Sequence, residues 1–274
     1  MLPTGLATPH LVVSDLDGTL LRTDGTASGR TAAAIAALHG VGIEWMIATA
    51  RPPRWLNGLT SVLGPGGVAV CSNGAFVYDA ERQLILDERP IVANTLRDIV
   101  ADLRATYPDI GFAAEGRHGL LKEPHYDDVH RESSVGSIAD VLDLPTPPGK
   151  LLARSVSTDP ARFIERVTDL VGDRGVVAYS GATGLAEISA AGVTKALVLD
   201  KLCSERGIDP AHVWAFGDMP NDLAMLAWAG TSFAVVNGHP AVLKAANHVV
   251  PGNDDDGVAQ TLERLVASLS HSDG

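Results

Sequence analysis

The sequence has little cysteine, little positive charge and no long apolar run, and each shortage argues against a class of protein. Two cysteines, Cys71 and Cys203, are too few for a disulfide scaffold, and both lie among apolar residues, as buried free thiols do. With 33 acidic against 21 basic residues, the net charge of -12 argues against binding to nucleic acid or to an anionic membrane surface. No apolar run approaches the length of a bilayer span. A local basic pocket for a phosphate group remains compatible with this charge.

The first ten residues do not combine a basic start with an apolar core, so we see no secretory signal and expect a cytoplasmic protein. Internal repeats and low-complexity tracts are also lacking. The composition, 46% hydrophobic and 20% charged, is typical of a globular protein with a substantial core. A chain of 274 residues accommodates one large domain or two modest ones.

Short apolar runs alternate with helical patterns in both terminal parts of the chain. The run Leu11 to Val13 is followed by a helical pattern from Ser28 to His39, with Ser28 as N-cap and Gly40 as stop. Four further apolar runs end at polar residues: 43–48, 67–71, 213–216 and 233–236. This alternation predicts an α/β fold with a doubly wound, Rossmann-like parallel sheet covered by helices on both faces. Ligands of such sheets bind beyond the carboxyl ends of the strands.

Residues 90–189 follow a different pattern. A helical pattern at 91–107 is followed by short strand-like runs, a proline-rich loop, a second helical pattern at 160–171 and two more strand-like runs. This order predicts an α+β module inserted into the parallel domain. We therefore expect residues 1–89 and 190–274 to form one domain and residues 90–189 another.

The first strand ends in two aspartates, Asp15 and Asp17, separated by one residue. Carboxylates at the end of a buried strand are costly to desolvate unless a ligand or a reaction uses them. A hard divalent cation prefers such oxygen ligands, and an aspartate can also act as a nucleophile. A solvated Asp-Gly turn would explain the pair equally well.

Three later segments carry compatible chemistry. Thr49 closes the second strand, where its hydroxyl and nearby backbone N–H groups, including that of Ala50, can hold a phosphate oxygen. Lys195 begins a helix, where its charge opposes the helix dipole unless an anion is bound there. The segment Gly217-Asp218-Met219-Pro220-Asn221-Asp222 places acids directly after an apolar strand. Each segment also has an ordinary structural explanation. Thr49 can be a strand-end cap, Lys195 a surface lysine, and the segment 217–222 the start of a helix.

Together, these segments resemble the haloacid dehalogenase superfamily of phosphohydrolases, and within it the Cof-type branch. The order is that of the superfamily, and the resemblance covers nearly the whole chain. The motifs of the branch are Ser72-Asn73-Gly74-Ala75, Gly192-Val193-Thr194-Lys195, Gly217–Asp222 and Asp256-Gly257-Val258-Ala259. The sequence departs from the branch at Ala50, where glycine is common, and at Val236-Asn237-Gly238, where a Met-x-Asn-Ala run is usual.

The resemblance implies a Mg²⁺-dependent phosphatase with a Rossmann-like core and an inserted cap that sets substrate specificity. Asp15 would be the nucleophile and Asp17 the general acid and base. The implied magnesium ligands are Asp15, the backbone carbonyl of Asp17 and Asp218, with Asp222 in support. The implied phosphoryl-binding residues are Thr49, Ala50, Asn73, Lys195 and Asn221. The implied catalytic set is Asp15, Asp17, Thr49 and Lys195.

The expected partner is a small phosphorylated metabolite, such as a sugar phosphate, and the oligomeric state is left open. An acid at Asp17 fits phosphatases and phosphomutases, which protonate an alkoxide, better than dehalogenases or ion pumps. A phosphomutase and a non-catalytic metabolite-binding regulator remain alternatives. Polar residues of the insert that are candidates for substrate contact are Glu115, Arg117, His118, Lys122, His125, Asp127, Asp128 and His130. The acidic run at 254–256 is expected to cap the following helix rather than to bind a second metal.

Overall fold

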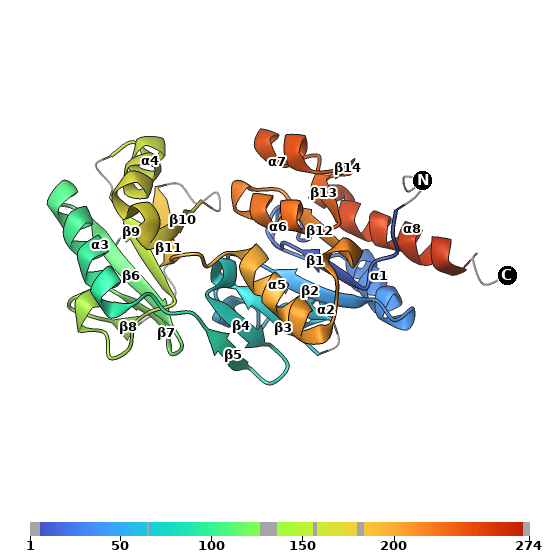
Figure 1. Cartoon of the computed structure of the whole chain (residues 1–274), viewed down its shortest axis with the longest axis horizontal. Helices are drawn as coiled ribbons and strands as arrows, with labels where there is room; N and C mark the ends of the chain where they lie inside the picture. The colour runs from blue at the N-terminus through green and yellow to red at the C-terminus, as the bar shows by residue number, and fades with distance from the viewer. Residues whose placement is uncertain (1–5, 65, 127–135, 156–157, 180–183, 271–274) are drawn as a thin grey trace. The chain divides into compact units, whose positions relative to one another are not determined.

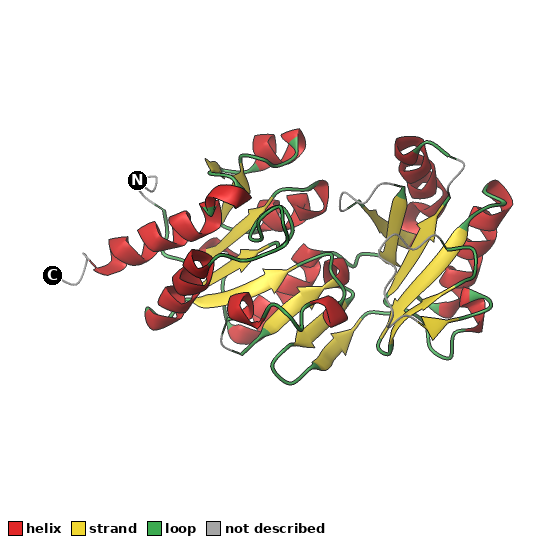
Figure 2. Cartoon of the chain, turned by 180° about the vertical axis from the view of Figure 1, so that it is seen from behind, coloured by secondary structure: helices red, strands yellow, loops and turns green. Residues whose placement is uncertain are grey.

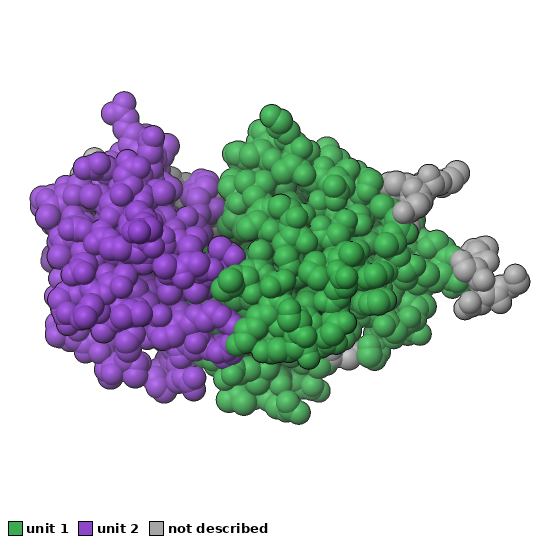
Figure 3. Space-filling model, viewed as in Figure 1, with its two compact units in different colours: residues 1–86, 195–274 green, residues 87–194 purple. Residues whose placement is uncertain are grey.

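The computed structural model describes residues 6–64, 66–126, 136–155, 158–179 and 184–270. The chain divides into two compact units, one made of residues 1–86 and 195–274 and the other of residues 87–194 (Figure 3). The expected boundaries, at 89/90 and 189/190, lie within five residues of these. We refer to the first unit as the core and to the second as the cap.

The core contains an eight-stranded sheet in the order β14-β13-β12-β1-β2-β3-β4-β5 (Figure 1). Neighbouring strands from β14 to β3 are parallel. The strands are β1 Leu11–Ser14, β2 Glu44–Ala48, β3 Val68–Cys71, β4 Phe76–Asp79, β5 Leu84–Glu88, β12 Val213–Gly217, β13 Thr231–Val235 and β14 His248–Val250. The predicted α/β fold with a doubly wound, Rossmann-like parallel sheet is therefore confirmed, except at one edge of the sheet.

Helices cover both faces of this sheet. Buried side chains of α1, α2 and α8 pack against one face, and those of α5, α6 and α7 pack against the other. The helices are α1 Gly29–Gly40, α2 Thr60–Leu63, α5 Lys195–Arg206, α6 Leu223–Trp228, α7 Pro240–Ala245 and α8 Gly257–Ser270. The Ser28 side chain accepts a hydrogen bond from the backbone N–H of Thr31, as expected of an N-cap, whereas α1 continues through Gly40.

One edge of the core sheet departs from the predicted parallel order. β4 runs antiparallel to β3, and β5 lies beyond it at the sheet edge. The short 3-10 turn η2, Ser72–Gly74, joins β3 to β4. Since a turn this short can connect only antiparallel neighbours, β4 cannot continue the parallel order. This turn brings the motif Ser72-Asn73-Gly74 to the carboxyl end of β3.

The cap contains a six-stranded sheet in the order β10-β11-β9-β6-β7-β8, with all neighbours antiparallel except β7 and β8. Helices α3 and α4 pack on one face of it through a buried apolar cluster (Figure 2). These elements are α3 Ala93–Thr106, β6 Gly111–Gly116, β7 Gly119–Lys122, β8 Gly136–Ser137, β9 Lys150–Arg154, α4 Pro160–Val171, β10 Gly175–Ala178 and β11 Leu185–Ala190. No helix among the described residues is both long and apolar enough to cross a membrane.

Candidate active site

The carboxyl ends of four neighbouring parallel strands bring the predicted site residues together. Asp15 directly follows β1, Asp218 follows β12, and Thr49 follows β2. The η2 turn follows β3, the next strand of the sheet. All of these positions belong to the core, so the candidate site is assembled without any cap residue.

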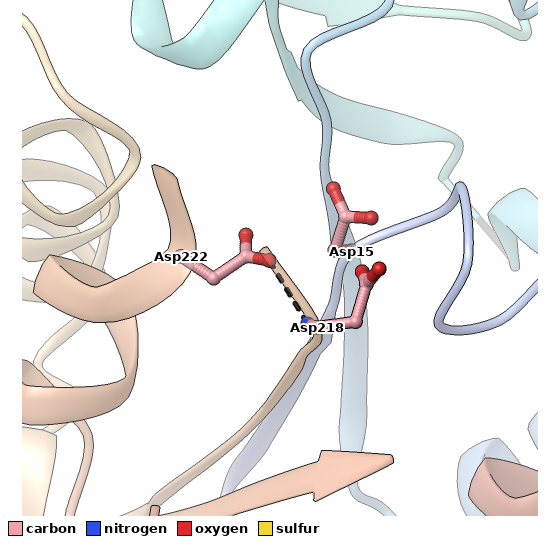
Figure 4. Close-up of side chains that lie close together, drawn as sticks. All are labelled: Asp15, Asp218 and Asp222. Carbon is pink, nitrogen blue, oxygen red and sulfur yellow. Dashed lines mark hydrogen bonds between the residues drawn. The ribbon is translucent and has the colours of Figure 1, made fainter. Parts of the chain in front are cut away.

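Three aspartates form an acidic cluster at this edge (Figure 4). One carboxylate oxygen from each of Asp15, Asp218 and Asp222 lies within 4.8 Å of the other two. All three residues are buried, and Asp222 is fully inaccessible. Burial and the neighbouring carboxylates raise the pKa of Asp15 well above its usual value, although Lys195 opposes this shift. Burial also raises the pKa of Asp218 to about 6.

Lys195 lies among these carboxylates at the start of α5. Its Nζ atom donates to Oδ1 of Asp15 at 2.6 Å and to Oδ1 of Asp222 at 2.7 Å. Burial of the ammonium acts to lower its pKa, but the charges of Asp15 and Asp222 more than offset this and raise it. Two carboxylates therefore stabilise a lysine that would otherwise oppose the helix dipole.

The cluster has chemistry that fits a hard divalent cation. Three buried carboxylates lie near one ammonium, and burial, together with the neighbouring carboxylates, raises the pKa of both Asp15 and Asp218. Carboxylate oxygens are the ligands that such a cation prefers. The loop after β1 also lies close to Asp218: Gly18 has a φ of 75°, and a Cβ atom there would lie 2.4 Å from Oδ2 of Asp218, so a side chain at this position would be strained and would displace that carboxylate.

Asp222 fixes the loop that carries Asp218. Its Oδ2 atom accepts hydrogen bonds from the backbone N–H groups of Asp218 and Met219, both at 3.1 Å. Its Oδ1 atom is bound by Lys195. Both oxygens of Asp222 are thus already partnered by the protein. Thr19, which the sequence did not single out, donates its hydroxyl hydrogen to Oδ1 of Asp218 at 2.6 Å.

The side chain of Asp17 lies outside the three-carboxylate cluster and is 53% exposed. Both of its oxygens accept hydrogen bonds from Arg51, from Nε at 2.8 Å and from Nη2 at 2.6 Å. This fork geometry fixes the orientation of the carboxylate. The sequence showed Arg51 two residues after Thr49 but gave no sign that it would pair with Asp17.

The remaining predicted phosphoryl-binding residues are joined by hydrogen bonds. Thr49 is fully buried, its Oγ1 atom accepts from the N–H of Arg51 at 3.0 Å, and its carbonyl accepts from the N–H of Asn73 at 3.0 Å. Asn221 donates from Nδ2 to Oδ1 of Asn73 at 3.0 Å. Ala50 lies half-buried in the loop between Thr49 and Arg51.

The acidic run after β14 has a structural role away from this site. Asp254 accepts hydrogen bonds from the backbone and hydroxyl of Thr23, and Asp256 forms an ion pair with Arg22. These side chains hold the segment that follows the Asp15–Asp17 loop. At the start of α8, the backbone carbonyl of Asp256 accepts a hydrogen bond from the N–H of Gln260 at 2.9 Å, and capping of this helix by the acidic side chains stays a prediction. None of them belongs to the acidic cluster found among the described residues.

Comparison with known proteins identifies relatives over nearly the whole chain. The family model described as haloacid dehalogenase-like hydrolase matches residues 12–262. A 5-amino-6-(5-phospho-D-ribitylamino)uracil phosphatase of Bacillus subtilis, YitU, is 30% identical over 93% of this chain and 97% of its own length. A phosphoglycolate phosphatase of Methanoculleus marisnigri is 29% identical over 94% of this chain and 97% of its own. A crystal structure of a Streptococcus mutans protein, SMU.1108c, superposes with a TM-score of 0.83 and 23% identity, covering 95% of this chain and 100% of that one.

Proposed function

This chain belongs to the haloacid dehalogenase-like hydrolases and is a phosphatase, and we propose that it hydrolyses a small phosphomonoester with Mg²⁺ through an aspartyl-phosphate intermediate. The observation that carries the proposal is the Asp15 carboxylate, buried at a strand end and bound through one oxygen by Lys195. The relatives' named activities support a small substrate, since both act on phosphorylated metabolites.

In the first half of the reaction, Asp15 attacks phosphorus. The bond between phosphorus and the substrate's ester oxygen breaks, and Asp17 gives the departing alkoxide a proton. Lys195 binds Oδ1 of Asp15 and thereby directs the carboxylate. The exposure of Asp17 leaves it accessible to a substrate oxygen. Because Arg51 occupies both of its oxygens, at least one of these hydrogen bonds must open so that Asp17 can take up the proton that it then gives to the alkoxide.

In the second half, water attacks the phosphorus of the aspartyl-phosphate and Asp17 takes a proton from that water. The bond between phosphorus and the Asp15 oxygen breaks, which restores the carboxylate and releases inorganic phosphate. Thr49, Lys195 and Asn221 are the groups that we assign to the phosphoryl oxygens, with the backbone at Ala50. The N–H and O–H groups of these residues would replace the water molecules that hydrate the phosphoryl dianion in solution.

The magnesium ion would be held by Asp15, the backbone carbonyl of Asp17 and Asp218, while Asp222 fixes the loop of Asp218. When bound, it supplies positive charge that neutralises the phosphoryl oxygens as charge develops on them. The close approach of three buried carboxylates at this strand edge supports this assignment.

We expect p-nitrophenyl phosphate and a panel of small phosphate esters to be hydrolysed only when Mg²⁺ is present. Because the pKa of Asp218 is about 6 and binding requires the carboxylate, the half-saturating Mg²⁺ concentration should rise as the pH falls below 6. Steady-state phosphate release over a magnesium titration at several pH values measures both effects. Absence of turnover for every ester would contradict the enzymatic proposal, and transfer of phosphate to a second substrate hydroxyl would favour a mutase.

We also propose that the cap sets substrate specificity. One face of its sheet packs against α3 and α4, while Glu115, Lys150 and Glu187 alternate with those core residues and so lie on the opposite face. Lys150 and Glu187 form a buried ion pair there. Among the predicted contact residues, Glu115 lies in β6 and is buried, whereas Arg117 pairs with Glu88. The predicted contacts Asp127, Asp128 and His130 lie outside the described residues.

Replacing His118, in the turn between β6 and β7, by alanine should alter the ranking of natural esters more than the rate with p-nitrophenyl phosphate. A nitrophenyl group offers few polar contacts for a specificity residue, so the rate with p-nitrophenyl phosphate should change little. The ratio of kcat/KM values between natural esters should change roughly tenfold at most. His39→Ala, in α1 of the core, is the matched control. Equal effects of both substitutions on every ester would contradict a role for His118 in specificity.

A further inference from the structure

The turn between β3 and β4 holds two consecutive residues in a backbone conformation that side chains rarely adopt. Ser72 has φ 51° and Asn73 has φ 56°, both in the left-handed region, and Gly74 follows with φ 110°. For a residue with a Cβ atom this conformation is strained, and it persists only where the surroundings impose it. Both residues are buried, with exposed fractions of 0% and 5%, so the surrounding structure holds them in this conformation.

Backbone hydrogen bonds fix this turn to the loop that follows β2. The N–H of Ser72 donates to the carbonyl of Arg51 at 2.9 Å, and the N–H of Asn73 donates to the carbonyl of Thr49 at 3.0 Å. These two bonds hold the turn in its left-handed conformation against the Thr49 loop. Glycine would satisfy these two bonds without strain, so they do not explain why asparagine stands at position 73.

The Asn73 side chain reaches a third loop, the one after β12. Its Oδ1 atom accepts the hydrogen bond from Nδ2 of Asn221, which lies in the 3-10 turn η6, Pro220–Asp222. The Oδ1 atom of Asn221 is buried and has no hydrogen-bond partner among the residues that the structure describes. A buried acceptor without a partner is unfavourable, so this atom is available for a donor from outside the described residues.

We propose that Asn73 is a positioning residue that orients the amide of Asn221 toward the phosphoryl group and does not itself bind substrate. The bond to Asn73 uses one N–H of Asn221 and leaves its second N–H and its carbonyl oxygen for the ligand. A phosphomonoester provides acceptors in its phosphoryl oxygens and a donor in a P–OH or neighbouring hydroxyl. This assignment rests on the proposed function, and it replaces the expectation that Asn73 contacts substrate directly.

A double-mutant cycle with inorganic phosphate as the probe tests the proposal. Binding is measured by calorimetry in the presence of Mg²⁺ for the wild type, Asn73→Gly, Asn221→Ala and the double variant. We expect Asn73→Gly to weaken phosphate binding roughly fivefold to tenfold, about the effect of one hydrogen bond. The double variant should bind no more weakly than Asn221→Ala, because Asn73 acts only through Asn221. Independent, additive losses would overturn the proposal.

Two further measurements separate positioning from a merely structural role. Glycine removes the strain at position 73, so the Tm of Asn73→Gly should not fall while its KM for p-nitrophenyl phosphate rises more than its kcat falls. Gln83→Gly is the matched control: Gln83 also has a left-handed φ of 53°, but it lies exposed between β4 and β5. Gln83→Gly should leave phosphate binding unchanged. A loss of phosphate affinity equal to that of Asn73→Gly would overturn the positioning role of Asn73. If the cycle shows coupling between Asn73 and Asn221 in phosphate binding but no ester is hydrolysed, the proposed function is contradicted and the positioning role of Asn73 is not.

Discussion

Replacing Asp15 by asparagine is expected to abolish phosphatase turnover, lowering kcat by at least about 10⁴-fold. A neutral amide oxygen is a poor nucleophile, and no other carboxylate occupies the same position beside Lys195 at the end of β1. Steady-state hydrolysis of p-nitrophenyl phosphate measures the loss. Rapid acid quenching with labelled substrate tests its cause, because protein-bound phosphate should appear in the wild type and be missing from the variant.

Asp17→Asn is the informative comparison, because Asp17 has a different task. Loss of a general acid and base typically lowers rates by about 10²- to 10⁴-fold. The loss should be smaller in the phosphorylation step with p-nitrophenyl phosphate, since nitrophenolate leaves with little protonation. Labelled protein should therefore still form slowly in Asp17→Asn. Near-normal turnover by Asp15→Asn would contradict the covalent mechanism.

Local patterns carry much of the information about this fold. The Asp159 side chain caps α4 and Pro160 opens it, and the predicted range 160–171 agrees with the helix. Strand ends were predictable for a related reason, because apolar runs stop where polar residues such as Asp15 or Thr49 begin. The rule that ligands bind at the carboxyl ends of parallel strands then predicted which loops would converge.

Contacts between distant segments were beyond such reasoning. The bond from Lys195 to Asp15 joins residues 180 positions apart, and the bond from Asn221 to Asn73 spans 148 positions. Motif resemblance placed these residues in one site but not in hydrogen-bonded pairs. The pairing of Arg51 with Asp17 was missed because a charged side chain beside a loop is usually solvated. β5 was missed because its residues are only half-buried or exposed and form no strong apolar run.

Replacing Lys195 by methionine should lower both activity and stability. Methionine has a similar length but no charge, so Asp15 and Asp222 would be left buried without their shared cation. Breaking a buried ion pair in this way typically costs about 3–5 kcal/mol, and we expect a loss of that size in the free energy of unfolding at pH 8. Urea unfolding without added metal measures it, and kcat for p-nitrophenyl phosphate should fall by at least about 10³-fold.

The pH dependence of this loss follows from the direction of the pKa shifts. The raised pKa of Lys195 means that its contribution to wild-type stability is complete below about 10.5 and is lost only as the pH rises through the folded-state value. The pKa of Asp15 is already raised in the wild type, and Lys195 opposes that shift, so removing Lys195 should raise the folded-state pKa of Asp15 further and make the folded variant bind protons more strongly than the folded wild type does. The stability of the variant should therefore fall as the pH rises, and the gap to wild type should be larger at pH 8 than at pH 5.

Lys201→Met provides the matched control on the same helix. Lys201 is 55% exposed and lies 3.9 Å from Glu205, so its loss should change the free energy of unfolding by no more than about 0.5 kcal/mol at either pH. A helix-wide effect of methionine would appear in both variants, whereas the loss of a buried counter-ion would appear only in Lys195→Met. A pH-independent loss in Lys195→Met would show that packing, and not charge, is what this lysine supplies to the site.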